Sequence, residues 1–375
     1  MKVLTNIWPY FLFNHVGDYF ANNEITSLGG QFKDMRFFQV ESVREIALAN
    51  LRSLTINAAH KIGLLNKNLE IFQPLFNLQC TSYLSEGYLK KIRPDVILAH
   101  SHIPRIGNTN TVPLVAVEYI SSKRYMEKVG VLQCLERDIE AKRWATELAN
   151  IIVTTTPESK KRFEHYIPET RGRLMQIPIY MPYLEPIPEE DITRKAQKDG
   201  FIRMLFIGGA ARRKGLPQVL SAMRLLPNSV RDRLRLTVIS NFQDGPVPGL
   251  ELATEVLSNV SREQLTELLS RAHIFVFPTQ FESYGRVIVE AMANGCAIIS
   301  SNTDPQDWIL DFGRSGILIN PESAEEIAAA IEELTENRHQ LLNYAISACR
   351  RFCRVFHHNV TGKQYRSAFD AAIKN

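Results

Sequence analysis

Short apolar runs alternate with longer amphipathic stretches along most of the chain. Apolar runs bounded by turn residues are typical of strands buried in a parallel sheet, and apolar positions three or four residues apart are typical of helices. In the second half, strands are predicted at 202–207, 234–240, 273–278, 297–300 and 316–319, and helices at 217–226, 262–272, 287–293 and 324–334. Ser261 and Gln264 form a capping-box pattern at the start of the second helix. This alternation predicts a parallel, doubly wound α/β sheet.

The first half of the chain alternates less regularly. Strands are predicted at 2–7, 35–40, 93–102, 112–119 and 150–156, and helices at 18–28, 42–67, 79–92, 130–149 and from 157 onward. Between the halves, Ile177–Pro188 holds four prolines and predicts a semi-rigid linker. We therefore expect two Rossmann-like, doubly wound domains. Their predicted bounds are 1–185 and 201–350, with a linker at 186–200 and a terminal segment at 351–375, and residues 340–373 are predicted to be helical with a break at 359–362.

Composition and charge narrow the class of protein. The 375 residues are 45% hydrophobic and carry a formal net charge of +4, which is too mild to favour a nucleic-acid partner. Five cysteines form no C-x2-C pair, which favours a reduced, cytoplasmic compartment. No apolar run approaches the roughly 20 residues that span a bilayer, and the N-terminus reads as a strand and not as a signal peptide.

A basic group on the helix after residue 157 leaves peripheral contact with the inner face of the membrane open. Its side chains could face an anionic membrane or a phosphorylated acceptor, or they could form a solvated helix face. The group comprises Lys160, Lys161, Arg162, Arg171 and Arg173.

Two carboxylates flank a predicted strand–loop–helix junction between Phe277 and Ser300. Glu282 lies in the loop after the strand, at the edge where open α/β sheets bind ligands. Glu290 lies about two turns into the predicted helix. The first free N–H groups of that helix, near Ser283, suit an anion such as phosphate. Hydroxyl-accepting carboxylates beside a phosphate site predict a pocket for a sugar nucleotide.

A second candidate loop, Gly208–Gly215, follows the strand at 202–207. Its glycines allow a close approach of the backbone to a ligand, and Lys214 with Arg212 or Arg213 could neutralise a pyrophosphate. The alternative interpretation is a basic surface turn. Since both loops leave the carboxyl ends of predicted strands, we favour the phosphate interpretation.

These motifs resemble those of a known family. Glu282-x7-Glu290, within PTQFESYGRVIVEAMANG, is similar to the E-x7-E motif of retaining glycosyltransferases of the GT-B fold, glycosyltransferase family four (glycosyl transferases group 1). Gly208 and Lys214-Gly215 match the family's G-R-x4-K-G loop, but Gly209 stands where the family has arginine, so Arg212 or Arg213 would supply that charge.

The resemblance implies a fold and an activity. It implies two Rossmann-like domains facing a cleft, an N-terminal acceptor side, a C-terminal domain that binds the nucleotide sugar, and a terminal helix that crosses back. The implied reaction moves a sugar, with retention, from a nucleotide-diphosphate sugar to a glycan or lipid-linked acceptor in cell-surface polysaccharide or glycoconjugate biosynthesis. A sugar phosphorylase or synthase that uses a sugar phosphate, and an inactive nucleotide-sugar-binding protein, remain alternatives.

The resemblance also implies roles for individual residues. The catalytic candidates are Glu282, Lys214 and Arg213. The donor-binding candidates are Gly208, Gly209, Arg212, Ser283, Tyr284, Gly285 and Glu290. The acceptor-side candidates are Gly17, His100, Glu118 and Tyr119; relatives carry a histidine where Tyr119 stands. No cofactor is expected besides the nucleotide-sugar co-substrate, and no metal, because the chain has no D-x-D sequence and the His100-x-His102 pair has no evident third ligand.

Overall fold

The computed structural model describes residues 2–5, 24–25, 36–39, 83–84, 93, 95–100, 105–106, 112–118, 135–147, 149–197 and 200–374. The chain forms two compact units. Unit 1 combines Met1–Pro182 with Thr361–Asn375, and unit 2 is Tyr183–Val360.

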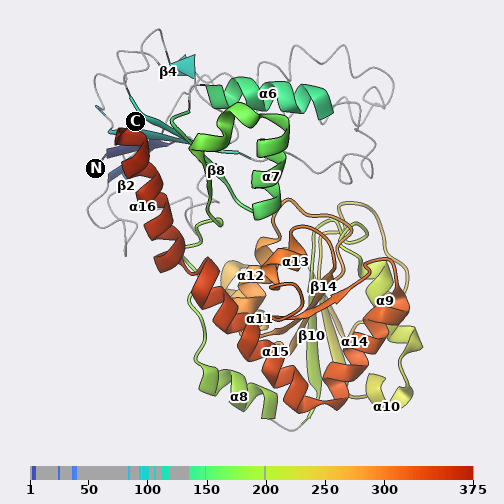
Figure 1. Ribbon diagram of the computed structural model, residues 1–375. Helices are drawn as coiled ribbons and strands as arrows, with labels where there is room; N and C mark the ends of the chain where they lie inside the picture. The colour runs from blue at the N-terminus through green and yellow to red at the C-terminus, as the bar shows by residue number, and fades with distance from the viewer. Residues whose placement is uncertain are drawn as a thin grey trace. The chain divides into compact units, whose positions relative to one another are not determined.

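Unit 2 contains a parallel sheet with helices on both sides of it (Figure 1). The strand order is β12-β11-β10-β13-β14-β15, and each neighbouring pair is parallel. Along the chain this order reads 3-2-1-4-5-6, the strand order of a Rossmann fold. The strands are β10 (Ile202–Ile207), β11 (Leu234–Ile239), β12 (Glu255–Leu257), β13 (Ile274–Phe277), β14 (Ala297–Ser301) and β15 (Ile317–Ile319). The helices are α8 (Glu189–Gln197), α9 (Leu216–Leu225), α10 (Asn228–Arg231), α11 (Arg262–Arg271), α12 (Arg286–Ala293), α13 (Gln306–Ile309), α14 (Ala324–Glu336) and α15 (Arg338–Arg351), with a short 3-10 helix at Leu250–Leu252 and a π-helical turn at Phe352–Phe356.

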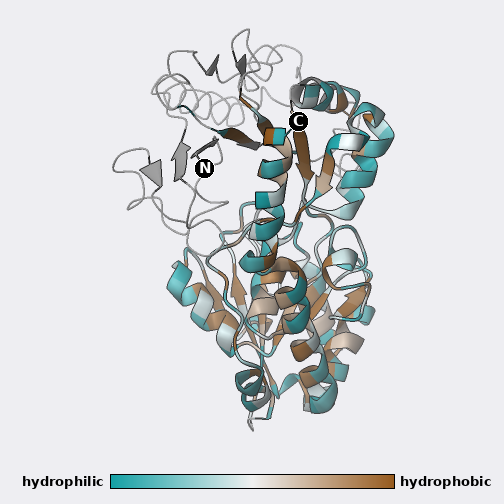
Figure 2. Ribbon diagram, turned by 60° about the vertical axis from the view of Figure 1, so that its left-hand side comes forward, coloured by the Kyte–Doolittle hydropathy of each residue, from teal (hydrophilic) through white to brown (hydrophobic). Residues whose placement is uncertain are grey.

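The core of unit 2 explains its apolar runs. Every residue of β13 and β14 is buried, because helices cover both faces of the sheet. Met204 and Phe206 of β10 pack into one hydrophobic cluster with α9 and α14. Figure 2 shows helices that alternate between hydrophilic and hydrophobic residues, as expected where only one face is buried.

Unit 1 contains a second, mostly parallel sheet. Its strand order is β2-β3-β1-β5-β7-β8-β9, and β2 alone pairs antiparallel, with β3. The strands are β1 (Lys2–Thr5), β2 (Glu24–Ile25), β3 (Arg36–Gln39), β5 (Val96–His100), β7 (Leu114–Val117), β8 (Ile151–Thr154) and β9 (Leu174–Gln176), with a separate pair β4 (Tyr83–Leu84) and β6 (Arg105–Ile106). The helices are α6 (Leu135–Glu147), α7 (Pro157–Tyr166), a 3-10 helix at Pro168–Arg173 and α16 (His358–Lys374).

Helix α16 is the C-terminal element of the chain and contributes to the core of unit 1. Tyr365, Ala368, Phe369 and Ala372 pack in the same hydrophobic cluster as strand residues such as Val115. The helix begins at His358, and its residues from Thr361 onward belong to unit 1. None of the helices in the described ranges is long and apolar enough to cross a bilayer.

The predicted α/β class with two Rossmann-like units is confirmed, and several local predictions are wrong. Glu24–Ile25 and Tyr83–Leu84 are strands inside segments predicted to be helical, because pairing with β3 and β6 overrides local propensity. The predicted linker at 186–200 contains α8, and Arg350 of α15 forms an ion pair with Glu189 of that helix. The break in the terminal helical segment lies at Phe352–His357, before the predicted 359–362.

Candidate functional site

The two candidate loops lie next to each other at the carboxyl edge of the unit 2 sheet. Strands β10 and β13 are direct neighbours, with Met204 paired to Ile274. The chain continues from β10 to β11 on one side, whereas β13 and β14 extend the other side. This is the point at which the strand order reverses, where open α/β sheets bind ligands. The sheet topology thus brings Gly208–Gly215 and the loop after Phe277 together.

Three predicted catalytic side chains meet in this place. The Lys214 amine forms an ion pair with Glu282 Oε1, and the Arg213 guanidinium lies 3.5 Å from the same oxygen. Arg213 Nη1 also donates a hydrogen bond to the carbonyl of Phe281, at 3.0 Å. The Lys214 and Glu282 side chains are only 14% and 11% exposed, so their charges interact in a partly desolvated setting where they count for more than in water.

Two backbone contacts hold the loops together. Gly215 has φ +86°, and a Cβ added there would lie 2.1 Å from the carbonyl oxygen of Pro278, so glycine is required for both conformation and space. The Gln280 N–H donates to the carbonyl of Arg213 at 3.1 Å. Lys214 and Glu282 therefore face each other because their backbones are locked.

The glycines at 208 and 209 make room for protein side chains. A Cβ at Gly208 would lie 2.8 Å from Lys214 Cγ, and one at Gly209 would lie 3.1 Å from the Gln243 amide carbon. The sequence predicted that these glycines admit a ligand close to the backbone. In the structure, the space over Gly208 holds the aliphatic part of Lys214, so this glycine positions the lysine.

Burial changes the acid–base behaviour of Lys214. Desolvation lowers the pKa of its amine to about 7, and the neighbouring Arg213 charge acts in the same direction. The amine also lies 5.1 Å from the centre of the Phe277 ring. Contact with Glu282 opposes the loss of the proton. Lys214 therefore depends on a neighbouring anion to stay charged at neutral pH.

The structure distinguishes the two candidate arginines. Arg212 donates from Nε and Nη2 to the carbonyl of Pro246, at 3.0 and 2.5 Å. Arg213 instead contacts the Glu282 loop, and its guanidinium carbon lies 4.9 Å from the centre of the Phe281 ring. Only Arg213 of this pair joins the Lys214–Glu282 cluster.

Glu290 lies in the first turn and a half of α12, closer to the helix start than the predicted two turns. It is 4% exposed. Tyr183 donates its hydroxyl to Glu290 Oε1 at 2.9 Å, and Arg262 Nη1 donates to the same oxygen at 3.0 Å. Neither partner was predicted from the sequence. The capping box at Ser261 fixes where α11 begins, but no local signal shows that Arg262 reaches α12.

The remaining donor-side candidates surround the start of α12. Gly285 has φ +89° and occupies the N-cap position without a side-chain capping bond. Ser283 is exposed, whereas Tyr284 is buried. The first N–H groups of α12 have the polarity that suits an anion. Anion binding at this helix start stays a prediction.

The acceptor-side candidates belong to unit 1. Glu118, directly after β7, is 1% exposed and forms an ion pair of 2.7 Å with Lys142 of α6. His100 is the last residue of β5, in register with Val117. Gly17 and Tyr119 lie outside the described residues. The Glu118 carboxylate is thus committed to a protein cation, and the acceptor roles of these residues stay predictions.

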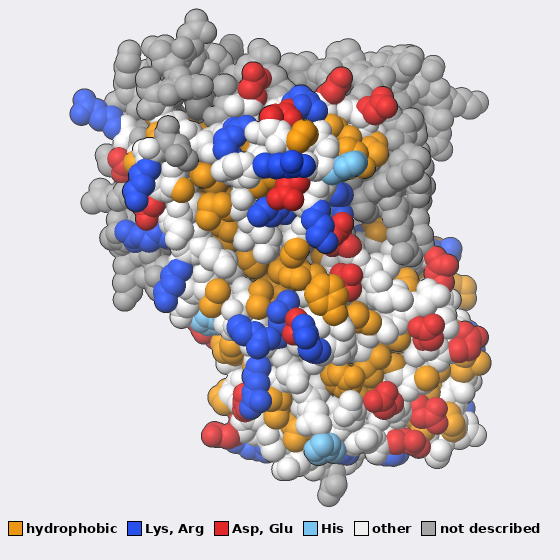
Figure 3. Space-filling view, viewed as in Figure 1, with side chains coloured by type: hydrophobic (Ala, Val, Ile, Leu, Met, Phe, Trp, Pro, Cys, Tyr) orange, Lys and Arg blue, Asp and Glu red, His pale blue; other side chains and the backbone are white. Residues whose placement is uncertain are grey.

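The predicted basic group on α7 is interleaved with acidic side chains. Lys160 and Lys161 lie 3.9 and 3.1 Å from Glu164 and Glu158. Arg173 donates to the carbonyl of Thr146 at 2.9 Å, near the end of α6. Figure 3 shows Lys and Arg side chains mixed with Asp and Glu over α6 and α7. Membrane contact through this surface stays a prediction.

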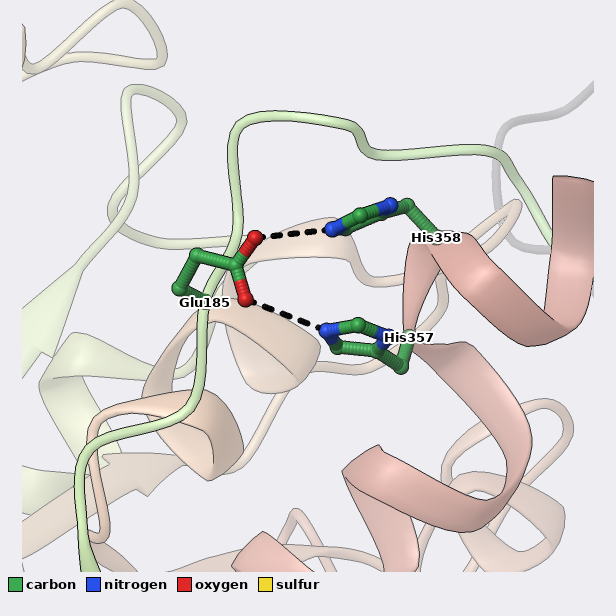
Figure 4. A group of neighbouring side chains, drawn as sticks. All are labelled: Glu185, His357 and His358. Atoms are coloured by element: carbon green, nitrogen blue, oxygen red, sulfur yellow. Dashed lines mark hydrogen bonds and ion pairs between the residues drawn. The ribbon is translucent and has the colours of Figure 1, made fainter. Parts of the chain in front are cut away.

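One group of three side chains among the described residues has the donor set of a metal site. The ligand atoms of Glu185, His357 and His358 all lie within 4.8 Å of one another (Figure 4). Two imidazoles and a carboxylate suit zinc. However, His357 Nδ1 accepts the N–H of Asn359 at 3.2 Å, so the proton of a neutral ring sits on Nε2, which lies 3.1 Å from Glu185 Oε2. Zinc would have to replace this proton, and we therefore assign the group as a hydrogen-bonded cluster.

Comparison with known proteins identifies relatives of this fold and site. The family described as "Glycosyl transferases group 1" matches residues 188–351. A D-inositol 3-phosphate glycosyltransferase from Pseudarthrobacter chlorophenolicus is 27% identical over 270 residues, which cover 65% of this chain and 63% of that protein. The chain thus spans less than two thirds of that relative's length.

Two solved structures share the fold. WaaG, a glycosyltransferase involved in lipopolysaccharide biosynthesis, aligns with a TM-score of 0.56 at 16% identity and covers 76% of this chain and 80% of that one. Anabaena Alr3699/HepE in complex with UDP aligns with a TM-score of 0.57 at 16% identity, covering 76% and 82%.

The two Rossmann-like units, with a charged cluster at the switch point of one sheet, define an α/β protein of the doubly wound class. Within that class, residues 188–351 match the glycosyl transferases group 1 family, and the fold is that of the GT-B glycosyltransferase WaaG.

Proposed function

We propose that this protein transfers a sugar from a nucleotide-diphosphate sugar to a glycan or lipid-linked acceptor, with retention of anomeric configuration, at the cytoplasmic side of the cell. The observation that carries the proposal is the Arg213–Lys214–Glu282 cluster at the switch point of unit 2. The match of residues 188–351 to the glycosyl transferases group 1 family supports the reaction class. The D-inositol 3-phosphate glycosyltransferase relative supports glycosyl transfer, and the UDP complex of HepE supports a nucleotide donor.

The cluster suits the leaving group of such a reaction. As the glycosidic bond to the diphosphate breaks, negative charge develops on the phosphate oxygen and positive charge on the sugar ring. Arg213 and Lys214 can stabilise the diphosphate, and a bound diphosphate would supply the anion that keeps the buried Lys214 amine protonated. Glu282, released from Lys214, could then accept hydrogen bonds from hydroxyls of the sugar.

Glu290 and α12 suit the rest of the donor. The carboxylate of Glu290 can accept hydroxyl hydrogen bonds from the ribose, and the start of α12 can donate to phosphate oxygens. This division places the diphosphate near Gly208–Gly215 and the sugar near Glu282. The peptide groups and cations named here act without a metal ion in this scheme.

The test is release of nucleoside diphosphate from UDP-, GDP- and ADP-sugars, measured with and without an acceptor mixture. Arg213→Gln and Lys214→Met should each slow release by about 100-fold, the effect of removing one charge-stabilising donor. Arg212→Gln is the matched control, because its guanidinium contacts Pro246, and its rate should stay within about threefold of wild type, the range of a surface charge effect.

Several outcomes would count against the proposal. Equal reductions in the rate of nucleoside diphosphate release in Arg212→Gln and Arg213→Gln would show that the cluster is not the diphosphate site. Turnover with a sugar 1-phosphate in place of the nucleotide sugar would favour a phosphorylase. Tight nucleotide binding without turnover for any donor would favour a binding protein. Where turnover occurs, the anomeric proton coupling of the product measures retention.

A further inference from the structure

The strongest unassigned feature of unit 2 is the set of side chains around Glu290. Glu290 is 4% exposed, and burying a polar side chain is costly unless hydrogen-bonding partners replace the lost water. Tyr183 and Arg262 supply two donors, at 2.9 and 3.0 Å. The Arg262 guanidinium also lies 4.2 Å from the centre of the Tyr183 ring, so each donor restrains the other.

Both donors bind the same oxygen of the carboxylate. Tyr183 and Arg262 each bond Oε1, and none of the other residues in the described ranges donates a hydrogen bond to Oε2. Two donors on one oxygen fix the rotation of the carboxylate and leave Oε2 as an acceptor for a ligand. Burial, together with the Glu290 charge, raises the pKa of Tyr183, so its hydroxyl keeps the proton that it donates.

The three residues come from three separate parts of unit 2. Tyr183 is its first residue, Arg262 is the first residue of α11, and Glu290 lies in α12 at the candidate site. Neither Tyr183 nor Arg262 belongs to the E-x7-E segment or to Gly208–Gly215. Both side chains donate a hydrogen bond to Glu290, and among the described residues neither donates one to another group.

We propose that Tyr183 and Arg262 are positioning residues that hold the Glu290 carboxylate ready to accept the ribose hydroxyls of the nucleotide, and that they thereby set the preference for ribonucleotides. This inference rests on the proposed function, because it assumes that a nucleotide binds beside α12. It adds two residues outside the recognised motifs, on which recognition of the ribose hydroxyls by Glu290 would depend.

The experiment measures three affinities for each variant. From UDP, GDP and ADP, the nucleotide with the largest thermal shift is chosen. Calorimetry then compares that ribonucleotide with its 2′,3′-dideoxy form and with inorganic pyrophosphate. Tyr183→Phe should weaken the binding of the ribonucleotide by about tenfold, which is the effect of losing one hydrogen bond to a charged group. The dideoxy form and pyrophosphate should change less than about twofold, because neither offers a hydroxyl to Glu290.

Arg262→Gln should also weaken binding of the ribonucleotide more than binding of the dideoxy form. If the glutamine variant folds poorly, Arg262→Lys replaces it, because lysine keeps the positive charge. Tyr365→Phe removes another buried tyrosine hydroxyl, and Arg271→Gln removes an arginine from the opposite end of α11; both should leave all three affinities unchanged. In a Glu290→Gln background, Tyr183→Phe should have little further effect, because the carboxylate that it orients is gone.

The outcomes separate this inference from the proposed function. Equal weakening of the ribonucleotide and the dideoxy form in Tyr183→Phe would overturn the positioning role while nucleotide binding stands. Wild-type protein that binds no nucleoside diphosphate would overturn both.

Discussion

Replacing Gly215 with alanine tests how the two site loops are locked together. Gly215 has φ +86°, and a Cβ there would lie 2.1 Å from the Pro278 carbonyl oxygen, which is backbone and cannot rotate away. Gly313 is a matched position in the same unit. Its φ is +92°, but a Cβ there would meet nothing within 4 Å. Comparing the two alanine variants separates the clash from the backbone strain.

The expected loss of unfolding free energy is the sum of the backbone strain and the clash. A left-handed backbone costs a non-glycine residue about 1–2 kcal/mol. Forcing extra atoms into a packed site adds about 1–3 kcal/mol. Gly313→Ala should therefore lose about 1–2 kcal/mol of unfolding free energy from strain alone. Gly215→Ala should lose about 2–5 kcal/mol, the sum of strain and clash.

Urea unfolding can measure this difference in unit 2 alone. Trp308, packed on Phe356 at 5.4 Å between ring centres, lies in unit 2, so a background with Trp8→Phe and Trp144→Phe makes its fluorescence the reporter. Linear extrapolation then gives the free energies of unfolding. Surface substitutions ordinarily change the free energy of unfolding by less than about 0.5 kcal/mol. If the losses of unfolding free energy in Gly215→Ala and Gly313→Ala differ by less than that, the loops are not locked as described.

Two further predictions concern a buried histidine and a helix cap. His273 is 1% exposed, its Nδ1 accepts the N–H of Arg203 at 3.0 Å, and burial lowers its pKa from 6.5 to about 4. The unfolded chain takes up this proton first, so stability should be complete above pH 6.5 and fall by about 3 kcal/mol between pH 6.5 and 4. His273→Asn, which keeps an acceptor, should flatten that fall in pH-dependent urea titrations; an unchanged slope would refute the assignment. Ser261→Ala and Ser323→Ala remove the N-caps of α11 and α14, and each should cost about 1 kcal/mol. Only Ser261→Ala should also weaken nucleotide binding in calorimetry, because α11 carries Arg262, and equal nucleotide affinities would contradict this.

Local patterns in the sequence predicted the elements that build the site. The capping box of Ser261 and Gln264 is present, because both of its hydrogen bonds form within one turn. The strand–loop–helix segments around Gly208 and Glu282 were also predictable, since apolar runs and glycines report on local backbone. The short strand at Glu255–Leu257 was not. It lies at the sheet edge, where Val256 is 43% exposed, and so carries no buried apolar run.

Long-range partners could not be read from the chain. Tyr183 and Glu290 are 107 residues apart, and their hydrogen bond depends on how the start of unit 2 packs on α12. Which of Arg212 and Arg213 contacts Glu282 depends on the backbone conformation of the turn, because adjacent residues of one turn point in different directions. Folding directs Arg212 to Pro246 and Arg213 to the Glu282 loop. Sequence predicts that a cation is available there, and the fold determines which one.

Under the proposed function, the charge balance of the cluster would let the buried Lys214 bind an anionic substrate. Arg213, Lys214 and Glu282 together carry a net charge of +1, and Glu282 holds the place of an anion beside the two cations. Burial and the Arg213 charge lower the pKa of the Lys214 amine to about 7, so the anion beside the amine decides whether it keeps its proton at neutral pH. A diphosphate can displace Glu282 because it brings more negative charge to the same donors, and the freed carboxylate then becomes available to sugar hydroxyls. Binding of the diphosphate and release of Glu282 would thus be one coupled exchange of anions on Lys214.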